Sequence, residues 1–201
     1  MRHSAKVIIV NTFRQLIQIK SIDKITVTEI CEIAEINRQT FYNHFTDLFD
    51  IFKFLFRQEV FNEIDQNRTF ETWCGGFLAT MNYLKRNSRM VLHVYDSSYR
   101  TNANTFFVEI TSQLLDTVVD ECMANLSVDL FEQDCRFIVN FYRHVFTGLM
   151  MDWVNEGMKE SPEELLKKLQ IMISGSITRS VEAFAEEEKR LWTTHAASKF
   201  R

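Results

Sequence analysis

Residues 25–51 read ITVTEICEIAEINRQTFYNHFTDLFDI and contain start signals for two short helices. Thr26 and Glu29 have capping-box spacing, in which a hydroxyl accepts a backbone N–H and a carboxylate reaches back to the cap residue. Asn37 is a good N-cap for the second short helix. Between them, EIN forms a tight turn. The stretch therefore predicts two short helices, at about 27–34 and 38–44.

The flanking sequence extends the helical pattern over the whole chain. The 201 residues include one proline and five glycines, so few positions interrupt a helix. Apolar residues recur at helical spacing before and after the opening stretch, which predicts an all-α fold. Asp47 and Asp50 repeat the capping pattern before a longer helix. The remaining predicted helices are 3–20, 47–66, 70–86, 89–96, 102–125, 128–157 and 162–187, with a loop around the polar stretch YDSSYRTNAN at 95–104.

One boundary in the second half is marked by four signals within ten residues, GMKESPEELL at 157–166. Gly157 can end a helix in the left-handed conformation. Ser161 is a good N-cap, Pro162 suits the first helical position, and Glu164 completes a capping box. We therefore predict a helix that ends near 157 and another that begins at 162.

The charge is unevenly distributed along the chain. The net charge is −4, which excludes a globally basic nucleic-acid binder. Residues 1–45 hold six Lys and Arg against four Asp and Glu, or +2, so residues 46–201 carry −6. This asymmetry places any anion-binding face near the N-terminus.

The remaining composition predicts a soluble cytoplasmic protein without a metal or cofactor. The four cysteines are scattered in apolar stretches without a CxxC pair, which favours buried reduced thiols over disulfides. There is no signal-peptide layout, and no apolar run approaches 18 residues, so no membrane segment is expected. No histidine has a zinc-type partner four residues away.

The order of the first helices matches a helix-turn-helix, whose second helix lies in the major groove of DNA. Arg38 can bind guanine or a phosphate, and Gln39 can pair with adenine. Thr40 can hydrogen-bond a base or touch a thymine methyl group. The side chains suited to phosphate oxygens are Tyr42, Asn43 and His44.

The aromatic residues of the second short helix have a different role. Phe41 and Phe45 are four residues apart and would face inward, where they lock this helix to its own small domain. An ordinary solvated helix in a bundle is the alternative. The order of elements favours the helix-turn-helix: a long helix, a capped short helix, a tight turn, a polar and aromatic short helix, and a capped long helix.

Residues 25–51 resemble the DNA-binding domain of the TetR family of transcriptional regulators. The matching positions are Thr26, Ile30, Ala34, Ile36, Thr40, Phe41, Tyr42, His44 and Phe45. The resemblance implies that Thr28 contacts phosphate and that Arg38, Gln39 and Thr40 read bases. It implies that Tyr42 and His44 hold the DNA backbone.

Two departures from the family pattern affect these expectations. Glu35 stands where the family usually has glycine, so the turn either avoids positive φ or accepts it at a cost. The family often has lysines just after the motif, where this chain has Thr46 and Leu48. One phosphate contact per protomer is then missing, which predicts weaker binding and a shallower salt dependence. Lys53 lies two turns further on and is expected to be solvated.

The resemblance also implies that the last two long helices form a homodimer interface, and the sequence supplies apolar stripes for it. One stripe is widened by Phe137, Phe141 and Trp153, while Gly175, Ser176 and Ser180 are small enough for close helix approach. The alternative is that both faces pack within one protomer; the dimer is favoured because symmetric half-sites require it. The stripes are Phe131, Cys135, Ile138, Tyr142, Val145 and Leu149, then Leu166, Leu169, Ile173, Ile177 and Phe184.

The resemblance further implies an effector, either a small molecule or a protein, bound by the C-terminal helices. No local motif identifies its site. Residues 141–169 resemble the corresponding region of a TetR subgroup that includes activators found with dihydroxyacetone kinase operons. Polar-tipped residues that could line a pocket among residues 49–150 are Trp73, His93, Tyr95, Tyr142 and His144.

The sequence thus predicts a helix-turn-helix DNA-binding domain at 1–48 and a dimerisation and effector domain at 49–201. The expected function is transcription regulation at a palindromic operator in double-stranded DNA. The alternative is a helical protein–protein interaction module with a degenerate helix-turn-helix. An enzyme is disfavoured because no Gly-rich phosphate loop, nucleophile elbow or carboxylate–histidine metal pattern occurs.

Overall fold

The computed structural model describes residues 4–66, 69 and 71–198, and these residues form helices and no strand, as predicted. The N-terminal unit consists of α1 (Ala5–Ile17), a 3₁₀ turn η1 (Ile22–Lys24), α2 (Val27–Ile33) and α3 (Arg38–Tyr42). The helices that follow are α4 (Leu48–Gln66), α5 (Trp73–Arg86), α6 (Ser88–Tyr95), α7 (Arg100–Leu126) and α8 (Glu132–Asn155). The chain then forms α9 (Pro162–Ile173) and α10 (Ser176–Ser198). The predicted starts at residues 3 and 70 lie outside the described residues.

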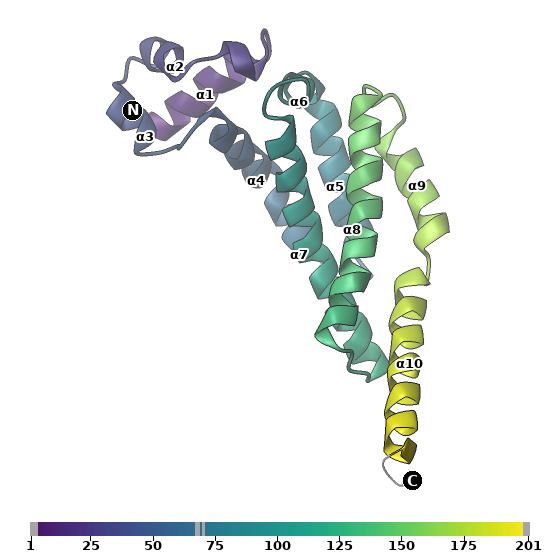
Figure 1. The fold of residues 1–201 in the computed structure, drawn as a ribbon. Helices are drawn as coiled ribbons and strands as arrows, with labels where there is room; N and C mark the ends of the chain where they lie inside the picture. Colours follow the sequence, from purple (N-terminus) through teal and green to yellow (C-terminus); the bar gives the residue numbers. More distant parts are fainter. Residues whose placement is uncertain (1–3, 67–68, 70, 199–201) are drawn as a thin grey trace.

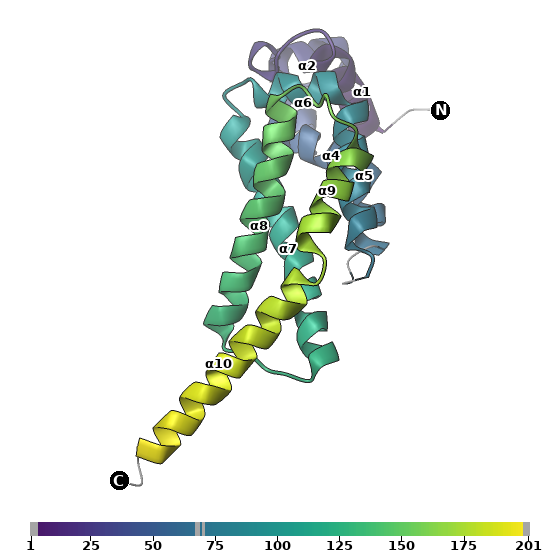
Figure 2. The same cartoon turned by 90° about the vertical axis from the view of Figure 1, so that its right-hand side faces the viewer.

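Figure 1 shows the N-terminal unit at one end of an elongated molecule, with α4 leading from it into the bundle. Helices α5, α7 and α8 run along the length of this bundle, and α6 lies at its end nearest to α1 and α2. In both Figures 1 and 2, α10 continues past the lower end of the other helices. The N-terminal unit and the free part of α10 therefore lie at opposite ends.

The caps predicted for the N-terminal unit form, with one difference. The Thr26 hydroxyl accepts the Glu29 N–H at 3.1 Å and starts α2. The Glu29 carboxylate does not complete the predicted box. It binds Lys20 Nζ at 2.6 Å, because the chain end of α1 brings that cation within reach. A charged partner therefore replaces the backbone N–H.

The next two caps start α3 and α4. Asn37 Oδ1 accepts the Thr40 N–H at 2.8 Å and starts α3. Asp47 accepts the Asp50 N–H at 2.7 Å, and Asp50 accepts the Thr46 N–H at 3.2 Å. These bonds satisfy backbone donors that have no partner within a helix, and they fix where α3 and α4 begin.

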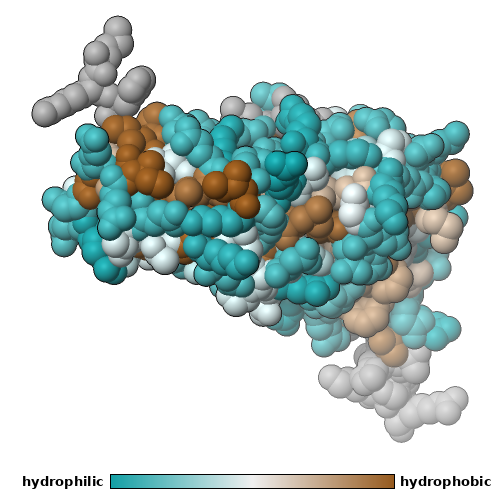
Figure 3. Space-filling view, turned by 90° about the horizontal axis from the view of Figure 1, so that it is seen from above, coloured by the Kyte–Doolittle hydropathy of each residue, from teal (hydrophilic) through white to brown (hydrophobic). Residues whose placement is uncertain are grey.

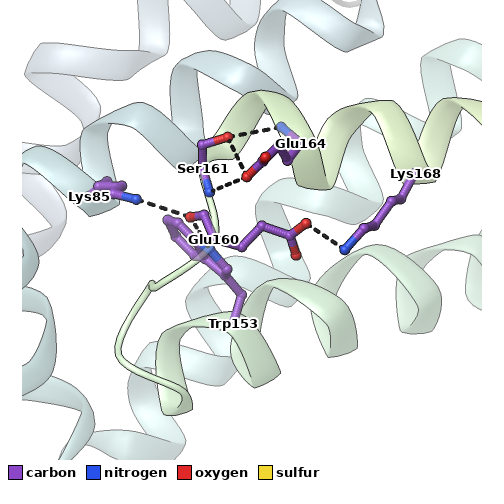
Figure 4. A network of polar contacts seen from close by, with 6 residues as sticks. All are labelled: Lys85, Trp153, Glu160, Ser161, Glu164 and Lys168. Carbon is purple, nitrogen blue, oxygen red and sulfur yellow. Dashed lines mark hydrogen bonds and ion pairs between the residues drawn. The ribbon is translucent and has the colours of Figure 1, made fainter.

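The predicted boundary between α8 and α9 also forms. Gly157 has φ +78°, which only glycine adopts without strain. Ser161 and Glu164 make the complete capping box, with Pro162 in the first turn. Figure 4 shows how the residue before the cap holds this turn to the bundle. The Glu160 carbonyl accepts Lys85 Nζ and Trp153 Nε1, both at 3.0 Å.

The final predicted helix, 162–187, is wrong in two respects. It is broken after Ile173, because Gly175 has φ +67°, and the second piece continues to Ser198. The space around the Gly175 Cα is open within the protomer, so this glycine serves the break, and its predicted close approach to a helix of a second protomer stays a prediction. The loop at 95–104 is also shorter than predicted, since α7 already begins at Arg100.

The core is built around α4. Phe56, at 0% exposure, meets the rings of Tyr83, Phe106 and Phe107 edge-on at 5.2–5.3 Å between centroids. The same buried cluster includes residues of α1, α2 and α3. A second cluster joins α7, α8, α9 and α10 further along the bundle. Helix α4 therefore shares one core with both the N-terminal unit and the bundle.

We predict that Ser161→Ala lowers the free energy of unfolding at neutral pH by about 1 kcal/mol, the usual cost of losing a serine cap. Bonds from Ser161 hold the pKa of Glu164 below its ordinary 4.5. The part of the stabilisation that comes from the Ser161 hydroxyl bond to the Glu164 carboxylate is therefore complete above pH 4.5 and is lost as the pH falls through the lower folded pKa, whereas the bond from the Glu164 N–H to Ser161 Oγ does not depend on pH. Urea titrations should show a difference between the two proteins that narrows in acid. A difference that widens would contradict this account.

Candidate DNA-binding surface and effector cavity

The residues predicted to contact DNA lie on one short helix and at the start of its neighbour. Helix α3 occupies the end of the N-terminal unit away from the bundle (Figure 1). Thr40 is half-buried, and the other predicted contact residues are exposed. The exposed residues are Thr28, Arg38, Gln39, Tyr42, Asn43 and His44.

The opposite face of this helix is buried, as predicted. Phe41 is 0% exposed and Phe45 is 3% exposed. Phe45 packs edge-on against Phe54 of α4 at 5.7 Å, and Lys6 of α1 lies 4.0 Å from the Phe54 ring centroid. The two phenylalanines thus hold α3 against α1 and α4 while its polar face points to solvent.

Hydrogen bonds join neighbouring polar side chains on the exposed face. Arg38 donates to Thr28 Oγ1 and to the Tyr42 hydroxyl, both at 3.4 Å. Gln39 Nε2 donates to Asn43 Oδ1 at 3.1 Å. These bonds are long or solvent-exposed, so DNA phosphates and base edges can replace them at small cost.

The Thr40 side chain has a second role that sequence reasoning missed. Its hydroxyl donates to Asn37 Oδ1 at 3.0 Å, on the same oxygen that accepts the Thr40 backbone N–H. The hydroxyl hydrogen therefore supports the helix cap. A methyl group and an acceptor lone pair remain for a base edge.

The turn before α3 adopts the strained geometry that glycine usually provides. Glu35 has φ +52°, so the chain accepts the left-handed conformation without glycine. Beyond α3, Lys53 Nζ lies 3.4 Å from Asp50 Oδ1 and is not simply solvated as predicted. Lys20 is paired with Glu29. These two lysines are therefore partly neutralised by carboxylates.

Polar contacts also hold the N-terminal unit to the rest of the molecule, among them a bond of 3.3 Å from the Ser21 hydroxyl to the His93 carbonyl. His93 Nδ1 of α6 lies 2.7 Å from the Ile17 carbonyl at the end of α1. Asp23 of η1 accepts the Ser98 N–H and hydroxyl at 3.0 and 2.6 Å, which keeps the pKa of Asp23 below its ordinary value. A further contact is an ion pair of 2.6 Å between Arg14 of α1 and Glu59 of α4. His93 is therefore a junction residue.

A cavity with a free volume of about 60 Å³ lies between α5, α7, α8 and α10. Its walls include Phe77, Leu114, Leu115, Val118, Phe146 and Ile177. Among the described residues, Trp73 is the predicted pocket residue that lines this cavity. The other lining residues were missed because apolar residues at helical spacing are indistinguishable from ordinary core.

The other predicted pocket residues have partners elsewhere. The Tyr95 hydroxyl accepts Arg100 Nη2 at 2.8 Å. The Tyr142 hydroxyl lies 3.1 Å from Ser180 Oγ, where it joins α8 to α10. His144 is adjacent to Arg143 on the surface side of α8, with 3.4 Å between their nitrogens.

The outer face of α8 carries exposed aromatic residues. Phe137 and Phe141 are 61% and 56% exposed, and Phe184 of α10 lies 6.0 Å from Phe137 between ring centroids. Trp153 is buried, so it belongs to the core and not to this face. The predicted line of α9 and α10 from Leu166 to Ile177 is also buried within the protomer. Elsewhere, the surface in Figure 3 is mainly hydrophilic with separate hydrophobic patches.

All four cysteines are free thiols, but the prediction of burial holds for only two. Cys31 and Cys122 are buried, whereas Cys74 and Cys135 are partly exposed. Burial raises the pKa of the Cys31 thiol, which keeps it protonated. In the residues that the structure describes, no group of His, Cys, Asp and Glu is placed to hold a metal ion. No described helix is long and apolar enough to cross a membrane.

The fold and the exposed polar helix define an all-α protein of the helix-turn-helix regulator class. Residues 71–175, just over half of the chain, match the model of a TetR-type transcriptional regulator C-terminal region. The chain therefore belongs to the TetR family of transcriptional regulators, which are not enzymes.

Individual relatives agree with this assignment. A match of 29% identity over 112 residues links the chain to the HTH-type dhaKLM operon transcriptional activator DhaS of Lactococcus lactis subsp. lactis (strain IL1403). The match covers 56% of this chain and 59% of that relative. The chain therefore spans less than two thirds of the relative's length. Together with the structural match below, this sequence match confirms the resemblance to the subgroup that includes this activator.

Solved structures share the fold. The dihydroxyacetone kinase operon activator DhaS aligns with a TM-score of 0.62 and 22% identity, over 90% of this chain and 98% of that one. The repressor NalD of Pseudomonas aeruginosa aligns with a TM-score of 0.53 and 17% identity, over 88% and 95%. The repressor AlkX of Dietzia sp. strain DQ12-45-1b aligns with a TM-score of 0.53 and 13% identity, over 90% of this chain and 99% of that one.

We predict that Glu35→Gly raises the free energy of unfolding by roughly 0.5–1 kcal/mol, because it relieves left-handed strain by more than glycine loses in chain entropy. The matched control is Glu32→Gly, an exposed position inside α2. Glycine there should lower the free energy of unfolding by about 1 kcal/mol. Chemical denaturation measures both. Destabilisation by Glu35→Gly would show that the turn is not strained.

Proposed function

We propose that this chain is a cytoplasmic, homodimeric regulator that binds a palindromic operator through α3 and is controlled by an effector in its C-terminal domain. We place the domain boundary at 48/49, at the start of α4. The observation that carries the proposal is the two-sided recognition helix. Its polar face is exposed, and its aromatic face is buried at 0% and 3% exposure for Phe41 and Phe45.

Within this proposal, base reading falls to the first turn of α3. Arg38 suits guanine O6 and N7, and Gln39 suits adenine N6 and N7. Thr40 contributes its methyl group, because its hydroxyl hydrogen bonds to Asn37. The residues that hold phosphates and set the register are Thr28, Tyr42, Asn43 and His44.

The dimer is supported by the exposed aromatic residues of α8. Phe137 and Phe141 are one helical turn apart, and both are more than half exposed. Large exposed aromatic residues on a rigid helix are typical of interface centres. Because α10 packs beside α8 at Phe184, the same two helices of a second protomer can complete an apolar four-helix contact.

Effector control would act through α4. Five residues separate this helix from α3, and it carries Phe56, which packs on the bundle helices α5 and α7. A ligand that shifts these helices changes how α4 presents the N-terminal unit. The two recognition helices then no longer match successive major grooves. By linkage, DNA must change the affinity for the effector by the same factor.

We predict that selection from a random DNA pool will enrich a palindrome. Gln39→Ala should lower the discrimination against the wrong base at one position of each half-site by about 1–3 kcal/mol. Tyr42→Phe should weaken binding to every sequence equally, because it removes a phosphate donor. Gln113→Ala, an exposed site on α7, is the control and should change neither. Absence of enrichment at low salt with a folded dimer would rule out DNA reading by the free protein.

We also predict that the double variant Phe137→Lys, Phe141→Lys is monomeric at concentrations where the unchanged protein is dimeric. Each substitution should weaken dimerisation by roughly 30-fold or more, since an interface aromatic is replaced by a buried charge. Sedimentation velocity measures the change. The control is Met172→Lys, because Met172 is 77% exposed on α9. Equal dissociation of both variants would place the interface elsewhere.

A further inference from the structure

In the cavity between α5, α7, α8 and α10, the two threonine hydroxyls already donate hydrogen bonds to the protein backbone. Thr80 Oγ1 donates to the Gly76 carbonyl at 2.9 Å, and Thr111 Oγ1 donates to the Phe107 carbonyl at 2.8 Å. Both hydroxyls therefore bond to their own helices. Neither has a hydrogen left to donate to a ligand.

The cavity walls also carry no charge. None of the described residues that line the cavity is acidic, basic or a histidine. The indole N–H of Trp73 is the remaining polar hydrogen among them. An ionised ligand would lose its hydration here without gaining a partner, which is strongly unfavourable.

Water is a poor occupant for the same reason. The free volume of about 60 Å³ exceeds the roughly 10–15 Å³ that one water needs. A buried water, however, requires two to four polar partners. The lining offers one donor, the Trp73 N–H, and the remaining lone pairs of two hydroxyls within an otherwise apolar wall, so apolar matter fills this space more favourably than water does.

The cavity adjoins a surface groove at the break between α9 and α10. Trp73 and Ile177 line both the cavity and a neighbouring groove. This groove is lined by Cys74, Gln170, Ser174 and Gly175, at the point where the positive φ of Gly175 lies between the two helices. The break in the last predicted helix thus opens beside the cavity.

The cavity is also joined to the helix that carries the DNA-binding unit. Phe107 lines the cavity and meets Phe56 of α4 edge-on at 5.3 Å. Phe56 is fully buried, so it cannot move without displacing its neighbours. A ligand that repositions Phe107 therefore acts directly on α4.

We propose that the effector is an uncharged, largely hydrocarbon small molecule with at most one acceptor oxygen, which enters at the α9–α10 break. The oxygen would accept the Trp73 N–H, and the hydrocarbon part would lie against the apolar walls. This inference rests on the proposed function only where it states that ligand binding changes DNA binding. The class of ligand follows from the cavity itself.

The test uses three probes with the full-length protein: 1-octanol, octanoate and dihydroxyacetone. Octanol and octanoate share a chain length and differ in charge, and dihydroxyacetone is small and polar. Binding is followed by calorimetry and by tryptophan fluorescence, with Trp73→Phe to assign the signal. We expect octanol to bind at least about tenfold more tightly than octanoate, and dihydroxyacetone not to bind. Stronger binding of octanoate or dihydroxyacetone, or no binding of octanol, would overturn the proposal.

Two variants locate the bound octanol. Leu114→Phe fills the cavity from α7 and should weaken octanol binding by at least about tenfold while keeping or raising the melting temperature. Thr80→Val should leave the affinity unchanged, because the Thr80 hydroxyl already bonds to Gly76. A loss of affinity in Thr80→Val with no loss in Leu114→Phe would show that a polar site is used.

The entry route has its own kinetic signature. Gln170→Trp narrows the groove without touching the cavity walls. Association and dissociation of octanol should both slow by a similar factor, with the equilibrium constant unchanged. Unchanged rates would place the entrance elsewhere.

Operator binding is measured separately with and without octanol. Octanol binding that leaves DNA affinity unchanged would reject effector control from this cavity and retain the ligand class. If no DNA binding is found with or without octanol, the regulator function is rejected, and the octanol binding results still stand.

Discussion

The edge-on packing of Phe56 on α4 is the contact on which the rest of the structure depends. Its ring meets Tyr83 of α5 and Phe106 and Phe107 of α7 within one buried cluster. Such pairs contribute about 0.5–1.5 kcal/mol each beyond the burial of their surface. Because α4 also contacts Phe45 through Phe54, the same helix fixes the recognition helix at one end and the cavity wall at the other. Binding at either site therefore acts on a common element.

Sequence reasoning was most accurate where a local chemical signal exists. The caps at Thr26, Asn37, Asp47 and Ser161 are formed by side chains within three residues of the backbone groups that they satisfy, so their spacing predicts the helix starts. The inward-facing Phe41 and the exposed polar face of α3 follow from helical periodicity in the same way. What these residues contact in DNA stays a prediction.

The errors arose where distant parts of the chain decide the outcome. Glu29 binds Lys20 and not its own cap, and His93 contacts the end of α1 and not a pocket. The break at Gly175 was not predicted, because a glycine inside an apolar pattern is compatible with both a continuous helix and a helix end. The cavity could not be predicted at all. Its lining differs from core only in the space between side chains, which a sequence does not record.

The shortness of α3 restricts how an effector can act. A helix of five residues is unstable alone and persists only because Phe41 and Phe45 bury their rings behind it. Deforming α3 would expose those rings, so regulation by bending the recognition helix is unfavourable. Moving the whole N-terminal unit costs less. Its polar links to the bundle, at His93, Ser21, Asp23 and Arg14, are not fully buried, and its buried residues share one core with α4. The unit is therefore expected to rotate as a rigid body on α4 while the surface that meets DNA keeps its shape.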